Sequence, residues 1–138
     1  MAVRKFLTLF TLLACMMLIL PVTAGEETEK SAEQGTVIFY RTRNVKGSAI
    51  GLNISGGDTG NVGVLSNGSK IVKKMPIGEF TFFVNSPSIA GQDSVTINVE
   101  AGKTYYVEGK TKWGWPAARP GFTLMDEKKG KAESDKIE

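Results

Sequence analysis

Residues 94–107 read SVTINVEAGKTYYV and contain two runs in which apolar and polar side chains alternate. Val95, Ile97 and Val99 are spaced two apart, so they share one side of an extended strand and the polar residues between them face the other side. The turn-forming step Ala101-Gly102-Lys103 interrupts the pattern before it resumes. Such half-buried strands are typical of a sandwich of two packed sheets.

The same pattern continues to both sides of this stretch, with short β-branched and aromatic runs between Gly, Pro, Asn, Asp and Ser. We therefore predict an all-β fold, a single small antiparallel β-sandwich of about eight strands behind an N-terminal signal peptide. No segment after residue 35 shows convincing helical periodicity. The expected strands are Thr36–Arg41, Ala49–Ser55, Asn61–Ser66, Ser69–Met75, Glu79–Asn85, Ser94–Glu100, Thr104–Trp113 and Gly121–Asp126.

Alternation also assigns the side chains that face the core. Asn67-Gly68 is the strongest turn signal, because both residues tolerate positive φ, and it predicts a tight hairpin between two alternating runs. The stretch 56–60, Gly-Gly-Asp-Thr-Gly, is expected to be a hairpin loop, since it lacks the ending of a phosphate-binding loop. The expected inward rows are Ile50, Leu52 and Ile54; Phe80, Phe82 and Val84; Val95, Ile97 and Val99; and Tyr105 with Val107.

Residues 1–24 have the organisation of an export signal. Arg4 and Lys5 precede an uncharged run over 6–20, and small residues end the segment at Ala24. We expect cleavage after Ala24 and a protein that is exported, to the periplasm or the cell envelope of a bacterium. Two alternatives are lipidation at Cys15 and retention of the segment as an uncleaved membrane anchor.

The expected domain at 35–126 lies between two polar segments. Residues 25–34 are acidic and lack hydrophobic periodicity, which predicts a flexible leader, and residues 127–138 are expected to be a charged, disordered tail with at most one helical turn. Loss of residues 1–24 leaves fifteen basic and fourteen acidic side chains. Such a small net charge gives little support for nucleic-acid binding.

Composition excludes several kinds of chemistry. Histidine is absent and Cys15 is the only cysteine. A Ser-His-Asp triad and a histidine-based zinc site are therefore excluded, and after signal cleavage so are a cysteine nucleophile and a disulfide. We expect no catalytic residues, no metal site and no cofactor. Carboxylates such as Glu79 and Asp93 remain, but a sandwich this small rarely encloses the cleft that two catalytic carboxylates need.

Four motifs resemble those of an exported bacterial family of unknown function, whose members look like small PEGA-type or transthyretin-like β-sandwiches. The resemblance spans about residues 35–126, and it implies this fold and an envelope location, often as a lipoprotein, but no binding residues. The chain departs from the family pattern at Ile77, inside the usual Pro-Gly pair, and in its longer stretch 56–60. The motifs are Gly35-x-x-x-Phe39-Tyr40-Arg41, Val62-Gly-Val-Leu-x-Asn-Gly-Ser69, Met75-Pro-Ile-Gly-Glu-Phe80 and Val99-Glu-Ala-Gly-Lys-Thr-Tyr-Tyr106.

Both tryptophans fall in one Gly- and Pro-rich connection, which makes this loop the leading candidate for a binding site. Trp113 and Trp115 can stack on a sugar ring or on an apolar group of a partner, and Arg119 can supply a planar fork for a carboxylate or phosphate. The alternative is that Trp113, in phase with the inward row of its strand, caps the open end of the sandwich.

Tyr106 is a further candidate binding residue, because it falls on the outer phase of its strand. With Phe83 and Met125 it is expected to form an exposed apolar strip. The alternatives are a bulge that shifts the phase, or coverage by one of the terminal segments. Lys70, Lys73 and Lys74 are more simply explained as protection of a sheet edge.

These observations predict a non-enzymatic envelope protein that binds a protein, glycan or lipid partner. The alternative is a structural accessory subunit, docked on a larger envelope assembly through an edge strand. Contact with a membrane is expected only if the protein is lipidated or its signal is uncleaved.

Overall fold

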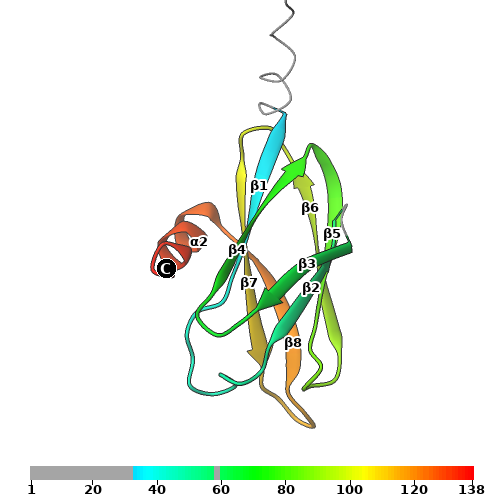
Figure 1. Cartoon of the computed structure of the whole chain (residues 1–138), viewed down its shortest axis with the longest axis vertical. Coiled ribbons are helices and arrows are strands. Elements are labelled where there is room, and N and C mark those ends of the chain that lie inside the picture. Colours follow the sequence, from blue (N-terminus) through cyan, green and yellow to red (C-terminus); the bar gives the residue numbers. More distant parts are fainter. Residues whose placement is uncertain (1–32, 58–59) are drawn as a thin grey trace, which may run out of the picture.

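The computed structural model describes residues 33–57 and 60–138, so the expected signal segment, Cys15 and most of the leader lie outside the described residues. Two four-stranded sheets pack face to face, and one helix lies outside them (Figure 1). All eight predicted strands are confirmed. They are β1 (Gln34–Tyr40), β2 (Leu52–Gly56), β3 (Gly60–Leu65), β4 (Lys70–Pro76), β5 (Gly78–Asn85), β6 (Gln92–Val99), β7 (Thr104–Lys112) and β8 (Arg119–Met125), and the helix is α2 (Glu127–Ser134).

The predicted inward rows form the core between the sheets. Members of all four rows are buried or packed against the core. Phe39 of β1 meets Phe82 of β5 edge to face, with ring centres 5.0 Å apart, and so joins the two sheets. The fully buried members of the predicted rows are Leu52, Ile54, Phe82, Val84, Ile97, Val99 and Val107.

One strand pair differs from the antiparallel expectation. The sheets have the orders β4-β1-β7-β8 and β3-β2-β5-β6, and β1 pairs with β7 in parallel. All other neighbours are antiparallel. Alternation within a strand does not depend on the direction of its neighbour, so this pairing is invisible in the sequence pattern. Gln34, expected to end the leader, is the first residue of β1.

The predicted hairpin at Asn67-Gly68 is wrong, although the turn itself is present. The Ser69 N–H donates to the Ser66 carbonyl at 3.2 Å, and Gly68 has φ +69°. The turn joins β3 of one sheet to β4 of the other, so the two strands do not pair. No described residue other than glycine has positive φ, so Asn67 does not adopt the conformation that a type I′ hairpin turn requires. The hairpin expected at 56–60 is confirmed by the pairing of Gly56 with Gly60.

The expectation of a disordered tail at 127–138, like that of no helix after residue 35, is also wrong. The segment begins with α2, whose first turn is capped by Asp126: the carboxylate accepts from the Lys129 N–H at 3.0 Å. The helix packs outside the β4-β1-β7-β8 sheet (Figure 1). Its buried residues are Gly130 and Ser134, four apart and therefore on one face. Small residues leave no apolar periodicity, so the helix escapes a search for hydrophobic pattern.

Tyr106 is not an exposed binding residue, because this helix covers it. Tyr106 is only 6% exposed and forms a buried cluster with Tyr40 and Ile137, against which Met125 also packs. The Tyr40 hydroxyl donates to Glu133 Oε2 at 2.7 Å, and burial together with this hydrogen bond raises the pKa of Tyr40. Phe83 lies on β5 of the other sheet, so the proposed strip of three residues does not exist.

Candidate functional site

The loop between β7 and β8 forms one wall of a groove at the end of the sandwich. The groove has a volume of about 460 Å³, and its other wall is the start of β6 in the opposite sheet. It brings together three of the predicted site residues, Trp113, Trp115 and Arg119, whereas Tyr106 lies elsewhere. The lining residues are Gly91, Gln92, Asp93, Lys112, Trp113, Gly114, Trp115, Ala117, Arg119 and Pro120.

The two indoles have different surroundings. Trp115 is 96% exposed, whereas Trp113 is 47% exposed. Lys46 Nζ lies 4.4 Å from the centre of the Trp113 ring, a cation–π contact, and a Cβ at Gly47 would lie 3.1 Å from the same ring. Trp113 is thus held as a partial cap, while Trp115 offers both faces of its ring to solvent.

The side chain of Arg119 lies close to Gly91, which lines the same groove. The stem passes beside Gly91, where an added Cβ would make ordinary van der Waals contact with Arg119 Cγ at 3.6 Å. The guanidinium forms no hydrogen bond or ion pair within the described part of the chain. Its planar fork is therefore available to a carboxylate or phosphate from outside.

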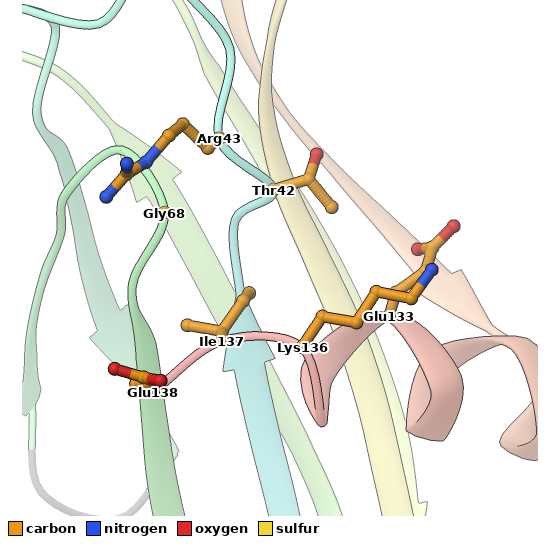
Figure 2. Close-up of a pocket in the computed structure, with 7 residues that line it drawn as sticks. All are labelled: Thr42, Arg43, Gly68, Glu133, Lys136, Ile137 and Glu138. Atoms are coloured by element: carbon orange, nitrogen blue, oxygen red, sulfur yellow. The ribbon is translucent and has the colours of Figure 1, made fainter.

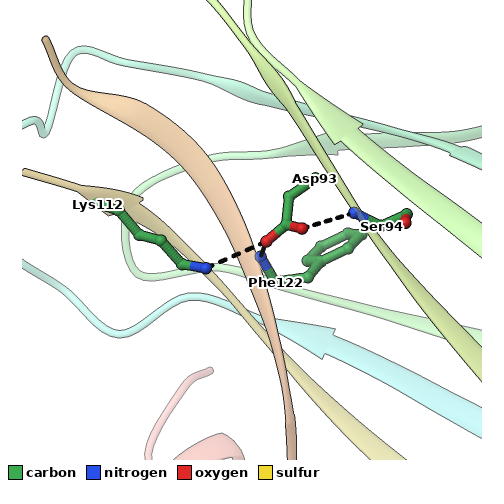
Figure 3. Close-up of polar contacts among 4 residues, drawn as sticks. All are labelled: Asp93, Ser94, Lys112 and Phe122. Atoms are coloured by element: carbon green, nitrogen blue, oxygen red, sulfur yellow. Dashed lines mark hydrogen bonds and ion pairs between the residues drawn. The ribbon is translucent and has the colours of Figure 1, made fainter.

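Asp93 fastens the two walls of the groove, a role that the sequence analysis missed. Its Oδ2 accepts from Lys112 Nζ at 3.2 Å and from the Phe122 N–H at 3.0 Å (Figure 3). Its Oδ1 accepts from the Ser94 N–H at 2.9 Å. Asp93 continues the two-residue spacing of Val95 and the other inward residues of β6. A carboxylate in an inward-facing row of a strand was the sequence feature that could have indicated this structural role.

These donors stabilise the ionised form of Asp93. The hydrogen bond from the Phe122 N–H, with those from Ser94 and Lys112, holds the pKa of Asp93 below its usual value, against the opposing effect of burial. The carboxylate belongs to the structure of the groove. Among the described residues its ion pair is with Lys112 and not with Arg119.

Replacing this carboxylate tests how much its hydrogen bonds stabilise the protein. We expect Asp93→Asn to lower the free energy of unfolding by about 1–2 kcal/mol at neutral pH, because the new amide N–H₂ faces backbone donors. The folded pKa lies below the unfolded value of about 3.9, so the advantage of the wild type is complete above that value and disappears as the pH falls through the folded pKa.

Chemical unfolding of both proteins between about pH 7 and pH 3 measures this difference. The matched control is Glu79→Gln, which changes an exposed carboxylate of β5 and is expected to shift stability by less than about 0.5 kcal/mol. A difference between wild type and Asp93→Asn that stays constant with pH would contradict the assignment.

Two further carboxylates have partners of their own. Glu100 pairs with Lys103, and Asp126 caps α2. Among residues 33–57 and 60–138, no three His, Cys, Asp or Glu side chains gather as they would around a metal ion. None of the described helices has the length and apolar character needed to cross a bilayer.

A second hollow of about 690 Å³ lies beside the end of α2, but its charged groups do not converge. Arg43 and Glu133 lie on opposite sides of the opening and point away from each other (Figure 2). The tryptophan groove, by contrast, places an exposed ring, a free guanidinium and polar side chains around one space. It is therefore the better candidate.

No family model, curated protein or solved structure matches this chain. The resemblance to small exported sandwiches accordingly stays a prediction, and the function is argued from the residues of the groove.

Proposed function

We propose that this protein is a non-enzymatic, exported binding module of the cell envelope that holds its partner in the tryptophan groove. The observation that carries the proposal is the exposure of Trp115, 96%, beside Arg119, whose guanidinium has no ionic partner among the described residues. Burying a large apolar side chain stabilises a protein by about 1.5–3 kcal/mol relative to leaving it exposed. The exposed indole of Trp115 does not contribute this free energy to the fold. Tryptophan and arginine are also the residue types that most often dominate binding interfaces.

The frame around the loop supports a rigid binding surface. β7 and β8 are paired in register up to Lys112 and Arg119, directly beside the loop. Asp93 bonds to Lys112 and Phe122 of the two strands that flank the loop, and Trp113, within the loop, contacts Lys46. A preorganised site loses little conformational entropy on binding, so its contacts translate more fully into affinity.

The orientation of the sandwich is compatible with attachment through the N-terminal segment. β1 begins at one end of the sandwich, and the β7–β8 loop lies at the opposite end (Figure 1). A lipidated or uncleaved N-terminus would therefore hold the protein at a membrane and leave the groove facing away from it.

Cross-linking in intact envelopes tests the proposal. The wild type, Trp115→Ala and Val45→Ala are expressed in the native host, and the captured material is identified. Val45 is the matched control, because it is 92% exposed and does not line the groove. We expect Trp115→Ala to capture at least about tenfold less of the partner, equivalent to 1.4 kcal/mol, and Val45→Ala to match the wild type. Equal capture by all three proteins contradicts the proposal.

A second candidate function, an accessory subunit docked through an edge strand, is favoured by β3. This edge strand, GNVGVL, has no charged side chain, and its Val64 is 59% exposed. The β4 edge carries Lys70, Lys73 and Lys74, a pattern that protects against strand addition. For this function, Val64→Lys rather than Trp115→Ala is expected to abolish capture.

A further inference from the structure

We infer that the ligand of the tryptophan groove is an acidic glycan, with a sugar ring on the face of Trp115 and its carboxylate in the fork of Arg119. The inference rests on the proposed function and names the ligand of the same site.

The charge of the groove selects an anion. Lys112, Arg119 and Asp93 are its charged lining residues, which leaves one positive charge in excess. Lys112 forms an ion pair with Asp93, and that carboxylate also accepts from two backbone N–H groups. Arg119 is therefore the one charged lining residue without a described ionic partner. Its two parallel N–H groups fit a planar carboxylate in a bidentate arrangement.

The remaining lining fits a sugar better than an acyl chain. Trp115 supplies a flat apolar face, and the exposed side chain of Gln92 supplies both a donor and an acceptor for hydroxyl groups. The volume of about 460 Å³ lies within the range of about 300–1,000 Å³ that is typical of small-ligand sites. A surface for lipid tails would instead present a continuous apolar patch.

The backbone of the groove disfavours an extended peptide. A peptide that adds to the free edge of β8 needs N–H donors at alternate residues of that strand. Pro120 has no N–H, and the N–H of Phe122 already donates to Asp93 at 3.0 Å. Two successive donor positions on this edge are thus closed to strand addition.

Titration calorimetry with tetragalacturonate and with its fully methyl-esterified form tests the inference on the full exported chain. The two probes share one sugar framework and differ in the carboxylate charge. We expect the wild type and Val45→Ala to bind the acid at least tenfold more tightly than the ester. Arg119→Gln should reduce this preference to less than threefold, and Trp115→Ala should weaken the binding of both probes by a similar factor.

Equal binding of both probes by the wild type overturns the inference, as does preferential binding of phosphatidylglycerol vesicles, which would assign the groove to a lipid surface. Absence of binding to both probes also overturns it. If envelope cross-linking still depends on Trp115 in that case, the proposed function stands and only the ligand class is wrong; if the cross-linking does not depend on Trp115, both fail.

Discussion

Arg41→Met is expected to lower the free energy of unfolding by about 3 kcal/mol, the larger of the two main stability effects. Arg41 directly follows β1 and is only 4% exposed. Its guanidinium donates to the carbonyls of Gly47, at 2.8 Å, and of Ile50, with a longer contact of 3.5 Å to the Leu65 carbonyl. Burial lowers the pKa of Arg41, and in place of a carboxylate the backbone oxygens solvate the charge.

The size of this effect follows from the one-sided loss of partners. Methionine preserves much of the volume of the arginine stem but leaves the carbonyls without a donor, and each buried, unsatisfied group costs about 1–3 kcal/mol. Partial rearrangement of the segment 42–51 and its access to water keep the total near the lower end of the summed range. Since Gly47 lies against the Trp113 ring, the substitution also loosens one support of the groove.

Chemical denaturation of the variant, with two controls, measures the effect. Arg43→Met removes a neighbouring exposed arginine and is expected to change stability by less than about 0.5 kcal/mol. Arg41→Lys keeps the charge without the planar fork and is expected to retain only part of the stability. If Arg41→Met lowers the free energy of unfolding no more than Arg43→Met does, the stabilising role of the buried Arg41 guanidinium is refuted.

Gly130→Ala is expected to destabilise the protein by about 2 kcal/mol, although helix propensity alone predicts a gain of about 1 kcal/mol. A Cβ at Gly130 would lie 2.6 Å from Tyr106 Cγ and closer still to its Cβ, so the helix must move away from the sheet. Helices as short as α2, with eight residues, are marginal in isolation and depend on such docking.

A double-mutant cycle separates propensity from packing. In a Tyr106→Gly background, both the obstructing Cβ and the ring are absent, so Gly130→Ala is expected to change from destabilising to neutral or stabilising. Lys128→Ala, on the exposed side of α2, serves as the helix control and is expected to have little effect. A gain in stability for Gly130→Ala in the wild-type background would show that the helix is not tightly docked.

The candidate site could be predicted only in part, because one wall is a single short stretch of the chain and the other comes from a distant segment. Trp113, Trp115 and Arg119 lie within seven residues of each other, so chain connectivity alone keeps them close. Gly91 and Asp93 come from the opposite sheet and reach the loop only when the sheets pack. The role of Asp93 depends on the N–H of Phe122, 29 residues away, which no local pattern reveals.

The sequence by itself determined the eight strands, the inward faces of four of them and the positions of the turns at 56–60 and 66–69, because alternation and turn chemistry act over a few neighbouring residues. Tertiary structure alone decided that β1 pairs with β7 in parallel, that Asn67-Gly68 crosses between sheets, and that α2 covers Tyr106. These features depend on contacts between distant segments. The surface that receives Gly130 exists only after the β4-β1-β7-β8 sheet has formed, and the wall that completes the tryptophan groove only after the two sheets have packed.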